Sequence, residues 1–264
     1  MEYISKTTHD GRNVRVKDYK KRVRRNRRRR KVLFVSFLLL CVMIFVHLSP
    51  LFNVKEVICT GNNKVSSEEL VSTSTISIGY NIFRTSVKKA ERNVRKIPYI
   101  KEARVIRRLP NKIEIKVTES GVCGYLPLAE GYIYIDENCK MLQYSESPPE
   151  EQVPVVQNTG ILSFEGGKIV TADDDKKTEL LTACYKAIIA DNALEKITII
   201  DVAQADTLTL FYNNSLEILV GNIKNIDYKI SFALRTINEK LGINPKGFLD
   251  IRNPENGTIY REKK

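Results

Sequence analysis

The stretch Ile97–Glu119, IPYIKEARVIRRLPNKIEIKVTE, decides the fold of the first folded segment. From Lys112 to Val117 apolar and charged residues alternate strictly, which is typical of a strand with one face on a core and one in water. The apolar positions are Ile113, Ile115 and Val117. Leu109-Pro110-Asn111 is typical of a turn, and residues 99–108 before it are predicted to form the partner strand. The stretch therefore predicts two strands joined by a Pro-Asn turn.

One further strand and two helices are expected upstream of this pair. Residues 54–59 are predicted to form a short strand, which the break at Gly61 ends. Ser66 and Glu69 form a capping-box pattern at the start of one helix. Apolar residues recurring at helical spacing indicate a second helix over about 86–96. The expected order is β-α-α-β-β over residues 53–119, a small sheet covered on one side by two helices.

Residues 120–252 are expected to form a second, mixed β domain with an antiparallel sheet and flanking helices. Short apolar runs separated by Gly, Pro and Asn predict strands, and Asn213-Asn214-Ser215 is predicted to join two of them as a hairpin. Helices are expected at 173–190 and 226–241. Strands are expected at 122–128, 131–135, 140–142, 153–156, 197–202, 208–212, 216–220 and 248–252. The fold class is therefore α+β, with a tail over 253–264.

The N-terminal region contains one long apolar run. No Asp, Glu, Lys or Arg occurs from Val32 to Val54, and the run VLFVSFLLLCVMIFVHL has no polar face. About 20 helical residues cross a hydrocarbon layer of ~30 Å. We therefore expect a transmembrane helix over 32–52. A cleaved signal peptide is the competing interpretation, and it fits poorly because the preceding region is long and no small-x-small site follows Leu48.

The positive charge of the chain is concentrated before this run. The formal net charge is +12, and residues 1–31 hold fourteen Lys or Arg against three acids. Basic residues flank membrane helices on the cytoplasmic side, so residues 1–31 are expected to be a cytoplasmic tail and the remainder to lie outside, a type II topology. The topology residues are Arg27, Arg28, Arg29, Arg30 and Lys31. A nucleic-acid-binding domain would carry its basic stripe on the folded body, so no nucleic-acid partner is expected.

Two patterns in the folded part are long enough to compare with known families. Ile97–Glu119 fits P-x-I-x-x-A-x-V-x-R-x-L-P-x-x-I-x-I-x-V-x-E, and LEILVGN over 216–222 is followed by FLDIR over 248–252. With the apolar run upstream, the chain resembles the FtsQ/DivIB cell-division proteins, which have a POTRA domain and a second, β-type domain. The resemblance implies a non-enzymatic, single-pass scaffold of the division machinery, located in the plasma membrane, enriched at the septum and supporting septum formation.

The resemblance also implies partners and partner-binding residues. The expected partners are proteins of the FtsL and FtsB/DivIC type, with the septal transpeptidase as a further candidate. Their binding residues in the second domain would be Phe248, Asp250, Arg252 and Tyr260. A local ion pair between Asp250 and Arg252 is the alternative, and the insertion 253–257 leaves the register of Tyr260 open. In the first domain, Ile113, Ile115 and Val117 belong either to a free strand edge that accepts a partner strand or to the core.

Little in the sequence suggests catalysis. Residues 53–264 contain no histidine, which removes Ser-His and Cys-His pairs and His-based metal sites. Neither a cofactor nor a small-molecule substrate is expected. A membrane-anchored cell-wall hydrolase or extracellular sensor is the alternative function, and its candidate carboxylates are Glu119, Asp136, Glu137 and Asp201. Of the five cysteines, Cys123 and Cys139 are the candidates for a disulfide, which the sequence leaves open.

Overall fold

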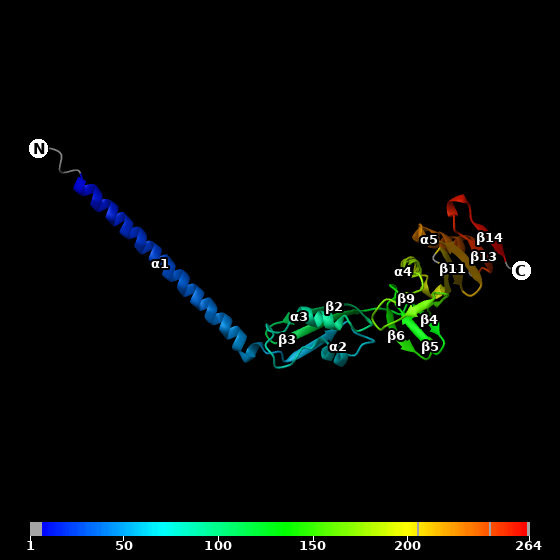
Figure 1. Ribbon diagram of the computed structural model, residues 1–264, viewed down its shortest axis with the longest axis horizontal. Coiled ribbons are helices and arrows are strands. Elements are labelled where there is room, and N and C mark those ends of the chain that lie inside the picture. Colours follow the sequence, from blue (N-terminus) through cyan, green and yellow to red (C-terminus); the bar gives the residue numbers. More distant parts are fainter. Residues whose placement is uncertain (1–6, 205, 243, 263–264) are drawn as a thin grey trace. The chain divides into compact units, whose positions relative to one another are not determined.

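A computed structural model describes residues 7–204, 206–242 and 244–262, and side chains from residue 26 on. Its first element is a helix, α1 (Thr7–Leu48), drawn in blue in Figure 1. The section Asn26–Leu48 is long and apolar enough to cross a membrane, and none of its most apolar window is buried by the protein. The helix therefore begins within the segment 1–31, which was expected to be a basic tail.

The POTRA-like segment has the predicted element order. It contains β1 (Glu56–Thr60), α2 (Ser67–Ser74), α3 (Val87–Val94), β2 (Ile100–Arg108) and β3 (Lys112–Glu119). The strands form one sheet in the order β1-β3-β2. Ser66 caps α2 as predicted, because its side chain accepts a hydrogen bond of 3.1 Å from the Glu69 N–H. The β-α-α-β-β prediction is confirmed.

Most of the remaining strands belong to a nine-stranded sheet with the order β14-β13-β12-β11-β10-β7-β4-β5-β6. The sequence predicted an antiparallel sheet, but β7 pairs in parallel with β4 and β10, and β12 pairs in parallel with β13. The sheet is mixed because a helix lies between β7 and β10 and another between β12 and β13, and such crossovers return the chain in the same direction. The bounds are β4 (Gly124–Leu128), β5 (Gly131–Ile135), β6 (Met141–Ser145), β7 (Val155–Gln157), β10 (Ile197–Gln204), β11 (Thr207–Tyr212), β12 (Leu216–Gly221), β13 (Gly247–Asp250) and β14 (Ile259–Glu262).

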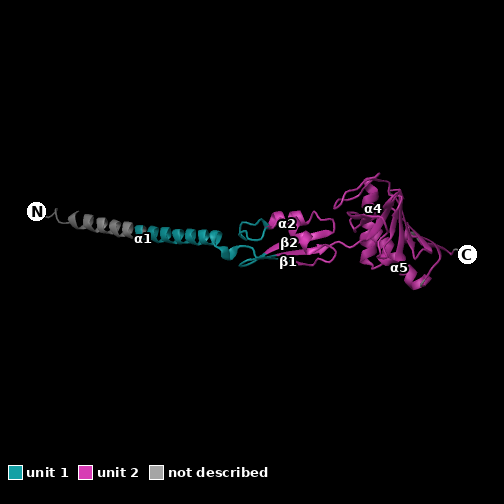
Figure 2. Cartoon of the chain, turned by 90° about the horizontal axis from the view of Figure 1, so that it is seen from below, with its two compact units in different colours: residues 1–58, 77–86, 107–113 teal, residues 59–76, 87–106, 114–264 magenta. Residues whose placement is uncertain are grey.

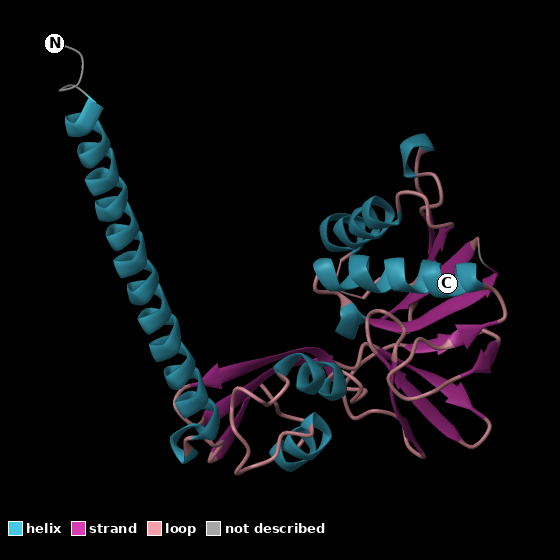
Figure 3. Ribbon diagram, turned by 60° about the vertical axis from the view of Figure 1, so that its left-hand side comes forward, coloured by secondary structure: helices cyan, strands magenta, loops and turns pink. Residues whose placement is uncertain are grey.

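The two crossover helices lie on the same side of this sheet, as Figure 3 shows in cyan. They are α4 (Asp175–Ala190) and α5 (Ile226–Thr236), the latter continued by a π-helical turn at Ile237–Leu241. Alternate residues of the central strands form one core with both helices, among them Leu180, Cys184, Ile188, Ile200, Leu210, Ile218 and Ile230. Burial of this apolar surface is the main stabilising contribution to the domain.

The sequence missed two short features of the domain. A hairpin of β8 (Ile161–Ser163) and β9 (Thr171–Ala172) encloses the glycine break at 166–167, and β14 follows the insertion that was predicted to be a tail. Runs of two to four residues do not show a period-two pattern, so alternation cannot identify them.

The described chain separates into two compact units, coloured teal and magenta in Figure 2. The first contains residues 1–58, Ser77–Ser86 and Arg107–Ile113, and the second contains the rest. The first unit thus joins α1 to two loops of the POTRA-like segment that lie far from it in the sequence.

A single carboxylate, that of Glu119, organises the loop between β1 and α2. It accepts backbone hydrogen bonds from Asn63, Lys64 and Val65 at 3.0, 2.9 and 2.9 Å. Partial burial alone would raise the pKa of Glu119, but these N–H donors outweigh it and hold the pKa below its usual value.

Replacing this carboxylate is expected to destabilise the loop. Glu119→Gln should lower the free energy of unfolding by about 1–2 kcal/mol near neutral pH, because bonds to a charged acceptor are stronger than bonds to an amide. The folded-state pKa is depressed, so the contribution is present above the unfolded carboxyl pKa and is lost as pH falls through the folded value. Thermal unfolding at pH 7 and pH 3 should show a difference between variant and parent that shrinks in acid. A constant difference would contradict this account.

Candidate partner-binding edge

The structure places the first set of candidate residues in the core of the POTRA-like segment. Ile113, Ile115 and Val117 are all buried, and their strand β3 lies between β1 and β2. The prediction that this strand has a free edge is therefore wrong, and the alternative, that the three residues belong to the core, describes their position. Strict alternation identifies a buried face, but it says nothing about a strand's place in the sheet order.

The second candidate strand is also not at an edge. Residues 248–252 were predicted to form the last strand, but β13 is flanked by β12 on one side and β14 on the other. The edge of the sheet is β14, and all four of its residues are exposed. The insertion does not turn the end of the chain into a tail: it forms a short 3-10 turn, Pro254–Asn256, that returns the chain antiparallel to β13.

The β13–β14 register places the candidate side chains on opposite faces. Tyr260 lies opposite Leu249, which is fully buried, so Tyr260 extends the helix-covered face. Its hydroxyl donates a hydrogen bond of 2.9 Å to the Lys246 carbonyl. Phe248 lies opposite Arg261 and next to Glu217 of β12, on the other face. The uncertain register of Tyr260 is thereby resolved.

A shallow groove of about 380 Å³ runs over this other face beside the edge strand. Its lining includes Phe248, Arg261 and Glu217 together with Phe211 of β11. These four residues form one cross-strand row, because Phe211 pairs with Glu217, Glu217 with Phe248 and Phe248 with Arg261. The row combines two aromatic rings with one charge of each sign.

Asp250 and Arg252 bind each other. The Arg252 Nη2 lies 2.7 Å from the Asp250 Oδ2, and the Arg252 backbone N–H donates to the Asp250 Oδ1 at 3.1 Å. The side-chain hydrogen bond from Arg252 holds the pKa of Asp250 below its usual value. The geometry is that of the local ion pair considered as the alternative, and a role for either residue in partner binding remains a prediction.

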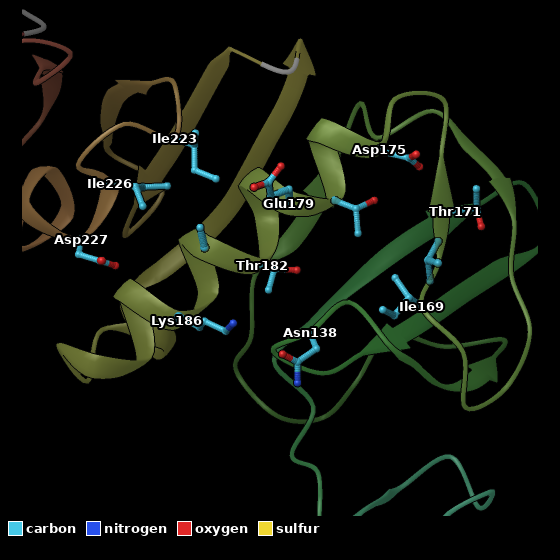
Figure 4. Close-up of a pocket in the computed structure, with 13 residues that line it drawn as sticks. Asn138, Ile169, Thr171, Asp175, Glu179, Thr182, Lys186, Ile223, Ile226 and Asp227 are labelled. Carbon is cyan, nitrogen blue, oxygen red and sulfur yellow. The ribbon is translucent and has the colours of Figure 1, made fainter.

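A larger groove of about 650 Å³ lies on the helical side (Figure 4). Glu179, Thr182 and Lys186 extend toward it from α4, with Asp227 of α5 and Ile169 of the β8–β9 loop at its borders. No cluster of three or more His, Cys, Asp or Glu side chains suited to a metal ion occurs in the part of the chain that the structure describes.

Known proteins match both segments of the chain. The POTRA domain, FtsQ-type, matches residues 52–120. The cell division protein DivIB of Clostridium acetobutylicum is 29% identical over 215 residues, which cover 80% of this chain and 84% of that protein. DivIB of Clostridium botulinum (strain Loch Maree) is 25% identical over 249 residues, covering 93% and 96%. Most of this chain is therefore similar to cell division proteins named DivIB.

Two further matches concern the same family. DivIB of Bacillus subtilis is 30% identical over 146 residues, covering 54% of this chain and 55% of that protein. The solved structure of the major extracytoplasmic domain of the trans isomer of DivIB from Geobacillus stearothermophilus aligns with a TM-score of 0.30 at 15% identity, covering 48% of this chain and 99% of that chain.

The four carboxylates proposed for a hydrolase bind other groups in this chain. Glu119 holds the β1–α2 loop, Asp136 accepts from the Ser120 hydroxyl, and Asp201 accepts from the Asn158 amide. Partial burial alone would raise the pKa of Glu137, but the Lys101 ammonium, 2.6 Å from the Glu137 Oε1, holds this pKa below its usual value. A glycosidase acid needs a raised pKa, so Glu119 and Glu137 have the opposite shift to the one required.

The candidate disulfide between Cys123 and Cys139 is not formed. Cys123 and Cys139 are both free thiols in buried positions. Burial raises the pKa of each thiol to about 12, so both are protonated at neutral pH and unreactive. These cysteines act here as small buried apolar side chains.

The topology residues lie in the described part of α1. Arg27, Arg28, Arg29, Arg30 and Lys31 are exposed and immediately precede the apolar run. A cytoplasmic N-terminus stays a prediction from the charge of this segment.

Proposed function

We propose that this chain is a non-enzymatic scaffold of the division machinery. Its relatives are named cell division proteins, and one apolar helix precedes its folded part. The helix anchors it in the plasma membrane with the basic tail in the cytoplasm and residues 53–119 and 120–252 outside. At the septum it gathers proteins of the FtsL and FtsB/DivIC type and, through them, the septal transpeptidase.

The observation that carries this proposal is the exposed edge strand β14. An edge strand presents unpaired backbone N–H and C=O groups, and a partner segment that pairs with them continues the sheet. The opposite edge, β6, is less open: the Met141 N–H donates to the Lys168 carbonyl at 2.8 Å, and the Met141 carbonyl accepts from Gly167 at 2.9 Å. Of the two ends of the sheet, β14 therefore supports strand addition better.

The groove beside β14 supplies side-chain contacts for such a strand. Phe248 and Phe211 offer apolar area, and Arg261 and Glu217 offer charges for polar contacts. Main-chain pairing gives affinity whereas side chains in neighbouring pockets give specificity. We propose that a DivIC-type partner pairs with β14 and places an apolar side chain against Phe248. Tyr260 acts indirectly, since its bond to Lys246 holds β14 in register.

Proline substitutions in β14 test this directly. Successive N–H groups of an edge strand alternate between the sheet and the open side. The Gly247 and Ile251 N–H groups donate on the β12 side, so Phe248 and Asp250 are the residues of β13 that bond to β14. Phe248 pairs with Arg261, and the N–H of the neighbouring Tyr260 therefore faces the open side.

Tyr260→Ala and Tyr260→Pro both lose the hydroxyl bond to Lys246, so the two variants should have the same melting temperature. Tyr260→Pro should bind the DivIC-type partner about tenfold more weakly than Tyr260→Ala, because an interstrand bond is lost and the ring obstructs pairing. Co-purification and titration with the purified partner measure the effect.

A matched control separates side chain from backbone. Tyr260→Ala keeps the backbone N–H and should weaken binding less than Tyr260→Pro, which lacks the same side chain and the N–H as well. If a stably folded proline variant bound the partner as tightly as the parent, β14 would not be the docking strand.

A further inference from the structure

Exposed apolar side chains gather in the loops of the unit that contains α1. Ile78 and Tyr80 are 65% and 67% exposed, and Leu109 is 60% exposed. They lie in segments Ser77–Ser86 and Arg107–Ile113, drawn in teal with α1 in Figure 2. Exposed apolar groups that cluster on one surface mark an interaction site.

Asn81 fixes the first of these segments to the C-terminal turn of α1. Its side-chain amide donates to the Val46 and His47 carbonyls at 3.0 and 3.3 Å, and its Oδ1 accepts from the Phe83 N–H at 2.9 Å. The last carbonyls of a helix lack intrahelical partners, so the buried Asn81 acts as a cap supplied from another segment. The loop therefore lies at the level of the last helical turn.

The last turn of α1 lies at the boundary of a membrane. The apolar run Val32–Leu48 contains about 17 residues and is ~25 Å long as a helix, whereas the hydrocarbon layer is ~30 Å thick. Val46 and His47 therefore lie no farther from the bilayer centre than the headgroup boundary. A loop bonded to their carbonyls lies in the same layer.

Hydrogen bonds hold the backbone of the loop at several points. Its backbone bonds to the strand entering β1: the Val54 N–H donates to the Tyr80 carbonyl at 2.9 Å and the Gly79 N–H to the Val54 carbonyl at 2.8 Å. The Arg107 guanidinium donates to the Ile82 and Thr85 carbonyls at 2.9 and 2.8 Å. Arg107 thus joins the two segments.

The charge of the two segments has one sign. They contain Arg84, Arg107, Arg108 and Lys112 and no acidic residue. The Lys112 Nζ lies 2.7 Å from the Glu56 Oε2, so Lys112 is paired within the protein and the attraction to headgroups rests on Arg84 and Arg107. Anionic headgroups attract such basic groups with about 1 kcal/mol each near the surface. Tyrosine with neighbouring apolar residues is the composition found where membrane proteins meet the headgroup layer.

We propose that Ser77–Ser86, together with the Leu109–Pro110 turn, is a membrane-docking surface that inserts Ile78 and Tyr80 between the headgroups of the bilayer that α1 crosses. Its occupant is an anionic lipid surface. The proposal rests on the membrane anchor in the proposed function, and it adds a second attachment that ties the membrane-proximal loops of the POTRA-like segment to the bilayer.

Tryptophan fluorescence tests this proposal, since the chain contains no tryptophan. The full chain is placed in nanodiscs of phosphatidylcholine and phosphatidylglycerol with Tyr80→Trp as its one tryptophan. Lipids brominated near the glycerol should quench this tryptophan about twofold or more, and its emission should shift to the blue, because it lies in the interface. Ile78→Trp gives a second position should Tyr80→Trp fail to fold.

Two matched variants separate this proposal from the anchor itself. Tyr228→Trp, in an exposed position of α5, should be quenched by aqueous iodide and not by brominated lipid. Phe45→Trp, in α1, should be quenched by lipid. If Phe45→Trp is quenched by lipid but Tyr80→Trp and Ile78→Trp behave like Tyr228→Trp, the docking surface is disproved and the anchor stands. If Phe45→Trp is open to iodide, both the anchor and the docking surface are wrong.

Discussion

Asp136→Ala is expected to lower the free energy of unfolding of the folded part by about 3–5 kcal/mol, because several buried donors lose their acceptor together. Asp136 is 2% exposed and follows β5. Its Oδ1 accepts from the Asn138 and Lys140 N–H groups at 2.9 and 3.0 Å, and its Oδ2 accepts from the buried Ser120 hydroxyl at 3.1 Å. Two backbone donors and one hydroxyl would remain unpaired in the variant.

The position of Asp136 explains why the effect extends beyond one turn. Ser120 directly follows β3 of the POTRA-like sheet, whereas Asn138 and Lys140 form the turn between β5 and β6. The Lys140 Nζ, 3.8 Å from the Asp136 Oδ2, donates to the Ile100 carbonyl of β2 at 3.2 Å. One carboxylate therefore organises groups from both sheets.

Urea unfolding of the variant, followed by circular dichroism, measures this loss. Asp201→Ala is the control, because Asp201 accepts one side-chain bond, from Asn158 at 2.9 Å, and is less buried. Asp201→Ala should lower the free energy of unfolding by about 1 kcal/mol. If Asp136→Ala and Asp201→Ala lowered the free energy of unfolding equally, the buried hydrogen bonds around Asp136 would contribute no more to stability than the single bond of Asp201.

The sequence was sufficient for elements whose pattern is local. The alternation at Ile113, Ile115 and Val117 predicted β3 because side chains in a strand alternate between faces. Ser66 and Glu69 predicted the start of α2 because the cap acts over three residues. Each of these signals is contained within a few neighbouring residues.

The sequence was not sufficient where the structure depends on distant pairing. The edge position of β14 depends on the order of nine strands, and Phe248 was assigned to an edge strand because nothing local distinguishes β13 from its neighbour. The hydrogen bond from Asn81 to Val46 joins residues 35 positions apart. A side chain that can cap a helix does not itself indicate which helix it caps.

Gly124→Ala is expected to cost about 1–3 kcal/mol, because a methyl group there overlaps a packed side chain. A Cβ at Gly124 of β4 would clash with the Tyr185 hydroxyl and would lie 3.0 Å from the Pro154 carbonyl oxygen. Tyr185 of α4 is fully buried and cannot move aside without disturbing the core. Thermal and urea unfolding of the variant should both show the loss.

Tyr185→Phe should relieve part of this cost, because it removes the hydroxyl oxygen, the atom that the added Cβ would approach most closely, and leaves the ring carbon Cζ at 3.0 Å. That hydroxyl has no hydrogen-bond partner among the described residues, so removing it alone should leave stability unchanged or raise it by up to about 1 kcal/mol. In the double variant the two changes should therefore be non-additive, with a favourable coupling of about 1 kcal/mol or more. If the two changes in free energy of unfolding were additive, the contact with Tyr185 would not be the reason for a glycine at position 124. Its backbone freedom or its close approach to Pro154 would then be the reason.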